Sequence, residues 1–330
     1  MTRKLGTYHP TFGYHFVPGL KARVEHEGGG YLVRANELGF RSEREFEPSK
    51  PSDVFRVLLF GDSFAAGMGV SNRDRFGDLL EQNVPGLEVF NFAVPGSGPD
   101  TQYLIYRELG SQIEHDLVLI AVWVQNIRRI VARYRSERLG DGEVRWVPKP
   151  YFQLGADGEL SLHNCPVPRD VVSTGDLSAQ DRQVQTRLVD RSAGARLPPR
   201  VKSVAQRVIR YDALPVYRDP RHPDWLLMKA ILDRWTRELT APAVVMPIPM
   251  HWHLEGMSSP KHYRRRFNEL ADPPARVIHD PFPDLMKYST SERRAFRFDV
   301  DTHPTRSYHR ALAHSLEKPI RQRMAARRLP

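Results

Sequence analysis

The stretch that decides the fold is residues 54–67, which read VFRVLLFGDSFAAG. A continuous apolar run stops at Gly-Asp-Ser and is followed by small residues, a pattern that predicts a buried strand leading through a tight turn into a helix. A serine at this point would lie where open α/β sheets bind ligands, beside the free N–H groups of a helix N-terminus that could stabilise an oxyanion. The tripeptide is also an ordinary strand-to-helix connection with Asp62 or Ser63 as the N-cap, so both interpretations stay open at this point.

Further apolar runs alternate with helical patterns on the carboxyl-terminal side of this stretch. Each run is short enough for a buried strand and is followed by polar, proline or glycine residues. We therefore expect an α/β fold, a three-layer α/β/α sandwich with a central parallel sheet and its site at the strand ends. Besides the first strand, the predicted strands are residues 87–94, 117–124, 243–248 and 276–279, and the predicted helices are 63 to about 83, 100–113, about 225–239, 260–270 and a final one after residue 305.

Two segments lie outside this alternating pattern. Residues 1–52 contain two short alternating runs around a Glu27-Gly28-Gly29 turn, which predicts a β-hairpin arm packed on a main domain of residues 53–330. Residues 135–215 are charged and proline-rich apart from one clear hairpin at 151–162, and we expect an insertion that borders the site and sets substrate choice. Four arginines at its root could meet an anionic or polyhydroxylated substrate or simply form a solvated face: Arg128, Arg129, Arg133 and Arg135.

Composition excludes several classes of protein. The 330 residues contain a single cysteine, Cys165, so neither an intrachain disulfide nor a thiolate metal cluster can form. The formal net charge is +10, but the basic residues are spread along the chain and form no recognisable nucleic-acid-binding module. We find neither a signal-peptide pattern nor an apolar run long enough for a bilayer. The expectation is a cytoplasmic protein with no cofactor, no nucleic-acid partner and no membrane partner, and its oligomeric state is left open.

A second candidate for chemistry lies near the carboxyl end, where residues 298–305 read FDVDTHPT. An aspartate two residues before a histidine, on a loop that leads into a helix, can hold a carboxylate against the imidazole while the other ring nitrogen points away. That arrangement makes a general base. A histidine in this position can equally be a helix cap or a surface residue, so the weight comes from its combination with the serine.

The four polar strand ends together resemble the SGNH/GDSL hydrolase family, which has a flavodoxin-like α/β/α fold. The first block matches at Gly61-Asp62-Ser63 and the second at residues 91–96, NFAVPG, with Gly96 five residues beyond Asn91. Asn126 takes the position of the third block, and Asp301 with His303 that of the last. The resemblance covers residues 53–134 and 241–318.

The resemblance implies a role for each of these residues. Ser63 would attack, His303 would take its proton, and Asp301 would fix the imidazole tautomer. The backbone N–H groups of Ser63 and Gly96 and the side-chain amide of Asn126 would form the oxyanion hole. Two blocks depart from the family: the third reads Val-Gln-Asn-Ile where Gly-x-Asn-Asp is usual, and the last lacks an aspartate three residues before its histidine, which favours Asp301 over Asp299.

The sequence therefore predicts a serine esterase that removes a small acyl group, with acetyl as a candidate, from a carbohydrate or natural-product hydroxyl. An acyltransferase that uses the same acyl-serine intermediate and a non-catalytic binding module on this scaffold are the alternatives. The α/β-hydrolase pattern Gly-x-Ser-x-Gly is not met, because residue 65 is alanine. His251 and His253 could hold a metal from one side of an extended segment, but no third ligand has a suitable spacing, and we expect no metal.

Overall fold

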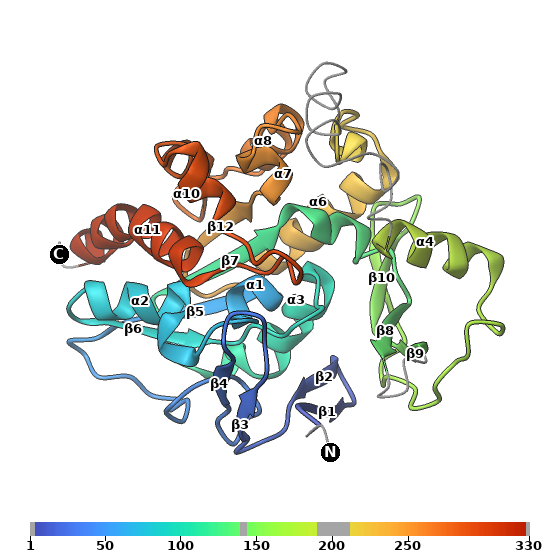
Figure 1. The fold of residues 1–330 in the computed structure, drawn as a ribbon, viewed down its shortest axis with the longest axis horizontal. Helices are drawn as coiled ribbons and strands as arrows, with labels where there is room; N and C mark the ends of the chain where they lie inside the picture. Colours follow the sequence, from blue (N-terminus) through green and yellow to red (C-terminus); the bar gives the residue numbers. More distant parts are fainter. Residues whose placement is uncertain (1–3, 139–143, 190–211, 328–330) are drawn as a thin grey trace.

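The computed structural model describes residues 4–138, 144–189 and 212–327. A five-stranded parallel sheet with the order β13-β12-β7-β5-β6 forms its centre (Figure 1). When the five strands are numbered along the chain and read from β6, their order is 2-1-3-4-5, which is a doubly wound sheet. The order reverses between β5 and β7, and such sheets bind ligands at that point, outside the carboxyl ends of the strands. The strands are β5 (Phe55–Gly61), β6 (Leu87–Asn91), β7 (Leu117–Trp123), β12 (Ala243–Ile248) and β13 (Arg276–Ile278).

Helices cover both faces of the sheet, so the central strands are apolar at nearly every position. On β5, Leu58 and Phe60 pack into the core beneath α3 (Pro99–Glu108) and α6 (Pro223–Arg237). Val57 and Leu59 alternate with them and pack beneath α2 (Phe76–Asn83) and α11 (Arg306–Arg327) on the opposite face. The predicted three-layer α/β/α sandwich is confirmed.

The helix expected from residue 63 to about residue 83 is wrong in its length. It is broken into the single turn α1 (Ser63–Ala66), the short 3-10 helix η1 (Asn72–Asp74) and α2. The break lies at Gly67, which adopts a left-handed conformation (φ +74°) and donates its N–H to the Ser63 carbonyl as a C-cap. Further α-helices in the described ranges include α4 (Ala179–Val189), α7 (His251–Leu254), α8 (Lys261–Asn268), α9 (Phe282–Leu285) and α10 (Thr290–Arg294).

The amino-terminal segment contains the expected hairpin and one that the sequence analysis missed. The expected one pairs β3 (Lys21–Val24) with β4 (Tyr31–Arg34), and the other pairs β1 (Gly6–His9) with β2 (Gly13–Phe16). Side chains that include Phe16, Tyr31 and Val33 form a small apolar cluster of their own. The boundary at residue 52 stays a prediction.

The inserted segment likewise contains a second hairpin. The predicted one is β10 (Tyr151–Leu154) with β11 (Leu160–His163), and β8 (Tyr134–Arg138) with β9 (Val144–Pro148) precedes it. The strand β8 reads YRSER, whose charge hides any apolar alternation, which explains why the sequence did not indicate it. Of the predicted insertion, residues 139–143 and 190–211 lie outside the described residues. Within the described ranges, no helix is both long enough and apolar enough to cross a membrane.

Candidate active site

The turn after β5 presents Ser63 as the first residue of α1. The Asp62 side chain caps this helix, because its Oδ1 accepts a hydrogen bond from the Phe64 N–H at 2.9 Å. Gly61 is required here, since a Cβ on it would lie 2.6 Å from the Ala65 Cβ and 3.1 Å from the Ala121 carbonyl oxygen. The Ser63 N–H lies in the first turn of the helix and has no intrahelical acceptor. The turn therefore leaves a backbone donor without an intrahelical partner next to the buried Ser63 hydroxyl.

A buried arginine from the amino-terminal segment holds the loop that follows Ser63. The Arg41 guanidinium donates to the carbonyls of Ala66 at 2.8 Å, Gly67 at 2.6 Å and Val70 at 2.8 Å, and to the Asn72 side-chain oxygen at 3.0 Å. Burial lowers the pKa of Arg41 to about 9. These bonds fix the break between α1 and α2, and with it the position of the serine turn.

Asp301 and His303 form a hydrogen-bonded pair on the loop before α11. The distance between His303 Nδ1 and Asp301 Oδ1 is 2.6 Å. The hydrogen bond from His303 lowers the pKa of Asp301 to about 2, and a bond from His26 adds to this effect. The carboxylate is therefore ionised at neutral pH, and His303 keeps its proton on Nδ1 and a free lone pair on Nε2 when it is neutral. The two residues have the arrangement that a general base needs.

The loop that carries His303 (the histidine loop) lies against the turn that carries Ser63 (the serine turn), but no hydrogen bond joins the two side chains. The His303 ring is 6.0 Å from the ring of Phe64, the residue after Ser63. Among the described residues there is no hydrogen bond between the Ser63 hydroxyl and His303. Catalytic hydrogen bonds are often loose without a substrate and tighten in the complex. Asp299 is exposed, and within the described ranges it has no contact with His303 of the kind that Asp301 makes.

The turns after β6 and β7 supply two further polar groups beside β5. Gly96 adopts a left-handed conformation (φ +79°), is exposed, and would point a Cβ into open space. Asn126 lies in the short 3-10 helix η3 (Val124–Arg128) after β7 and is fully buried. Its side-chain oxygen and nitrogen both lack a hydrogen-bond partner among the described residues. A buried amide without a partner is costly, and such a group in a native protein calls for an explanation.

Arg129 is a member of the site that the sequence analysis interpreted differently. Its guanidinium pairs with Asp62 Oδ2 at 2.7 Å, donates to the Ser97 carbonyl at 3.3 Å, and stacks over the Trp123 ring at 5.1 Å. It therefore ties the serine turn to the turn that holds Gly96. The other arginines at the root of the insertion also have partners in the chain: Arg128 the Ala213 carbonyl, Arg133 the Tyr151 ring and Arg135 the Tyr14 ring.

The two histidines considered as metal ligands do not lie on an extended segment, so that prediction is wrong in its geometry. They lie on helix α7, where residues two apart point to different sides. His251 is buried, donates Nε2–H to the Thr302 carbonyl at 2.7 Å, and has its pKa lowered to about 3 by that burial. His253 packs against Tyr263, with ring centroids 4.9 Å apart. His251 thus supports the histidine loop as a neutral donor, a role that no motif indicates.

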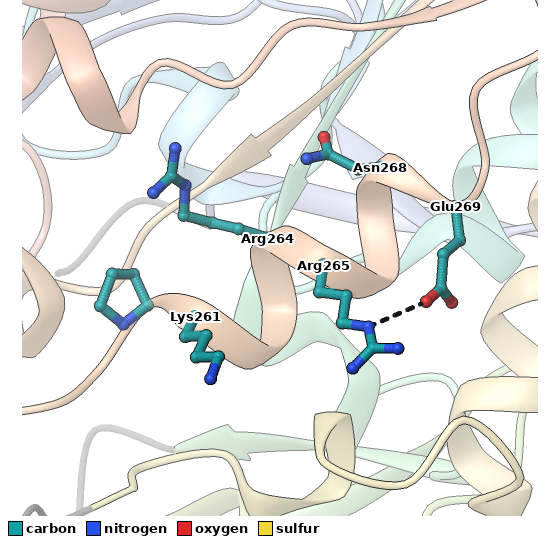
Figure 2. Close-up of a pocket in the computed structure, with 6 residues that line it drawn as sticks. Lys261, Arg264, Arg265, Asn268 and Glu269 are labelled. Carbon is teal, nitrogen blue, oxygen red and sulfur yellow. Dashed lines mark ion pairs between the residues drawn. The ribbon is translucent and has the colours of Figure 1, made fainter.

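A groove of about 630 Å³ lies away from these residues, over helix α8. It is lined by one face of that helix, with Arg265 paired to Glu269 (Figure 2). None of the residues described above lines it. The groove is therefore not part of the candidate active site.

Three solved structures illustrate what the chain is similar to. A lipolytic protein of the G-D-S-L family from Veillonella parvula is 11% identical, with a TM-score of 0.41, over 80% of this chain and 97% of its own. TesA is 10% identical, with a TM-score of 0.42, over 81% and 99% of the two chains. The psychrotrophic esterase EstA from Pseudoalteromonas sp. is 11% identical, with a TM-score of 0.41, over 82% and 98%. No protein-family model and no curated protein matches the sequence.

Proposed function

We propose that the chain is a serine esterase of the SGNH/GDSL type, with Ser63 as its nucleophile. The observation that supports this most directly is the Asp301–His303 pair, which lies over the helix turn that begins with Ser63. The Asn126 amide at the end of the neighbouring strand adds a donor that has no hydrogen-bond partner among the described residues.

The reaction would proceed in two balanced steps. The Ser63 hydroxyl attacks the ester carbonyl while His303 Nε2 takes its proton, and the resulting imidazolium is stabilised by the Asp301 carboxylate. The tetrahedral oxyanion would accept hydrogen bonds from the N–H groups of Ser63 and Gly96 and from the Asn126 amide. His303 then returns the proton to the leaving alcohol. In the second step His303 deprotonates the water that attacks the acyl-serine carbonyl, and it gives this proton back to the Ser63 oxygen as the acid leaves.

The substrate class belongs to the same proposal. The resemblance to the family favours a small acyl group, with acetyl as a candidate, on a carbohydrate or natural-product hydroxyl. An acyltransferase is the alternative, in which a second hydroxyl takes the place of water. Substrate choice by the insertion and a cytoplasmic location also stay predictions. One contact supports a role for the insertion beside the site. Lys149, after β9, forms a buried ion pair with Asp100 in the first turn of α3, a few residues beyond Gly96.

The test uses Ser63→Ala with a matched control, Ser111→Ala, which removes an exposed hydroxyl just after the carboxyl end of α3. Ser63→Ala should abolish hydrolysis of a p-nitrophenyl acetate and leave the unfolding midpoint within a few degrees, whereas Ser111→Ala should behave as the wild type. A fluorophosphonate probe should form a covalent adduct that peptide mass spectrometry places on Ser63. Undiminished turnover by purified Ser63→Ala protein would rule out this mechanism. Added sugar hydroxyls that divert the acyl group from water would identify a transferase.

A further inference from the structure

The carboxylate of Asp301 has a second histidine on its other oxygen. The distance between His26 Nε2 and Asp301 Oδ2 is 2.8 Å, and the His26 side chain is 9% exposed. His26 follows β3 in the amino-terminal hairpin, 275 residues away from Asp301 in the chain. The carboxylate therefore lies between His303 on Oδ1 and His26 on Oδ2.

The protonation of His26 follows from its other ring nitrogen. The Gly28 backbone N–H donates to His26 Nδ1 at 3.2 Å, so Nδ1 carries a lone pair and not a proton. The proton of the neutral ring must then be on Nε2, and His26 donates it to Asp301. A neutral donor orients the carboxylate without cancelling its charge, which leaves the full charge available to the His303 imidazolium.

The same turn holds the backbone of the histidine loop. The Glu27 carboxylate accepts hydrogen bonds from the N–H groups of Val300, at 3.1 Å, and Asp301, at 2.6 Å. The Phe298 ring lies between two glycines, since a Cβ on either Gly28 or Gly69 would approach it to 2.7 Å. The ring also meets the edge of His26 at a centroid distance of 4.4 Å. The amino-terminal turn thus contacts the histidine loop in three places. His26 binds the Asp301 side chain, Glu27 binds the backbone of residues 300–301, and Gly28 packs against the Phe298 ring.

We propose that His26 is a positioning residue for the Asp301–His303 pair, which it completes as the outer member of a His26–Asp301–His303 relay of hydrogen bonds. For catalysis the inference rests on the proposed function, but the position of the His303 proton can be measured whether or not the chain is an esterase. Because a carboxylate with one oxygen free can rotate about its Cβ–Cγ bond, loss of the His26 donor should let the imidazole leave the orientation that the reaction needs.

The experiment tests the two ring nitrogens of His26 separately. His26→Gln places an amide N–H₂ near the position of Nε2, whereas His26→Asn is too short to reach Asp301 and retains only an acceptor for the Gly28 N–H. His314→Leu, which changes an exposed histidine on α11, is the control. We expect the rate of fluorophosphonate labelling at Ser63 to stay within about twofold of the wild type for His26→Gln and His314→Leu. It should fall about tenfold or more for His26→Asn, which loses a hydrogen bond to a charged group.

Proton NMR supplies the readout that a merely structural role would not change. The low-field signal of His303 Nδ1–H, assigned by its loss in His303→Gln, should persist in His26→Gln and broaden or disappear in His26→Asn at an equal unfolding midpoint. Labelling and a proton signal that are unchanged in His26→Asn would overturn the inference while leaving the esterase proposal intact. If wild-type Ser63 is not labelled at all, the esterase proposal fails, and the NMR comparison alone decides whether His26 orients the pair.

Discussion

Replacement of Asp301 by asparagine tests the candidate site most sharply, because both neighbours of this carboxylate are donors. His303 Nδ1–H and His26 Nε2–H point at its two oxygens. An asparagine has one carbonyl oxygen and one N–H₂ group, so an N–H would meet an N–H at one of the two contacts. One imidazole must then move its proton to the other nitrogen. If His303 does so, its Nε2 carries a proton and can no longer act as a base.

The size of the effect can be worked from this geometry. A hydrogen bond to a charged group contributes about 1.5–3 kcal/mol, which corresponds to roughly 10- to 150-fold in rate. A wrong tautomer in a Ser–His–Asp triad raises the loss to about 10⁴-fold. Because the Asp301 side chain is 38% exposed, water can replace part of the lost interaction. We therefore expect kcat/KM to fall by roughly 10²- to 10³-fold.

The assay is steady-state hydrolysis of a p-nitrophenyl acetate, with Asp299→Asn as the matched control on the same loop. Asp299→Asn should stay within a few-fold of the wild type, because Asp299 is exposed and, of the two aspartates, it is Asp301 that makes the hydrogen bond to the His303 ring. The double variant Asp301→Asn with His26→Asn should lose less than the product of the two single losses, since the opposing N–H is gone. A larger loss in Asp299→Asn than in Asp301→Asn would refute the assignment of the carboxylate.

Three further outcomes can be measured on single variants. Asn126→Ala should lower kcat by roughly 10²-fold or more with little change in KM, if its amide bonds only the oxyanion, and a pure rise in KM would make Asn126 a substrate-binding residue. Lys149→Met leaves the buried Asp100 carboxylate unpaired, so urea titration should show a free energy of unfolding lower by about 3–5 kcal/mol, and an unchanged midpoint contradicts the pairing. Burial lowers the pKa of His309 to about 3, below its value of about 6.5 in the unfolded chain, so the stability it contributes is complete above pH 6.5 and is lost as the pH falls toward 3. At pH 5 this loss is about 2 kcal/mol, and His309→Asn should show a correspondingly smaller drop between pH 7 and pH 5 than the wild type.

The sheet could be predicted because burial on both faces leaves a strong local pattern. The strand at residues 243–248 has the same bounds in the structure as in the sequence analysis, since Pro242 and Pro249 stand on either side of the apolar run. The contact of Asp301 with His303 was also accessible, because a spacing of two residues on one loop constrains the side chains directly. Local pattern and local spacing are what one sequence can reveal.

The parts that were missed depend on contacts between distant segments. Nothing near His26 marks it as a partner of Asp301, and the unbroken helix expected after Ser63 fails because Gly67 and the Arg41 guanidinium stop it. The extended conformation expected for His251 and His253 is wrong, because the chain turns into α7 two residues after its strand ends. Each of these features depends on tertiary packing, which a local sequence pattern does not record.

The hydrogen bond between His26 and Asp301 has a consequence for the order of events during synthesis. The chain is made from its amino terminus at about 5–20 residues per second, so the 275 residues between these partners take on the order of 15–55 seconds to follow. During that interval the hairpin turn with His26, Glu27 and Gly28 exists without the loop that it holds. The Asp301 carboxylate can therefore be held from both sides only after the chain has been made past residue 303, so a nascent chain that carries the turn with Ser63 would still lack the proposed general base.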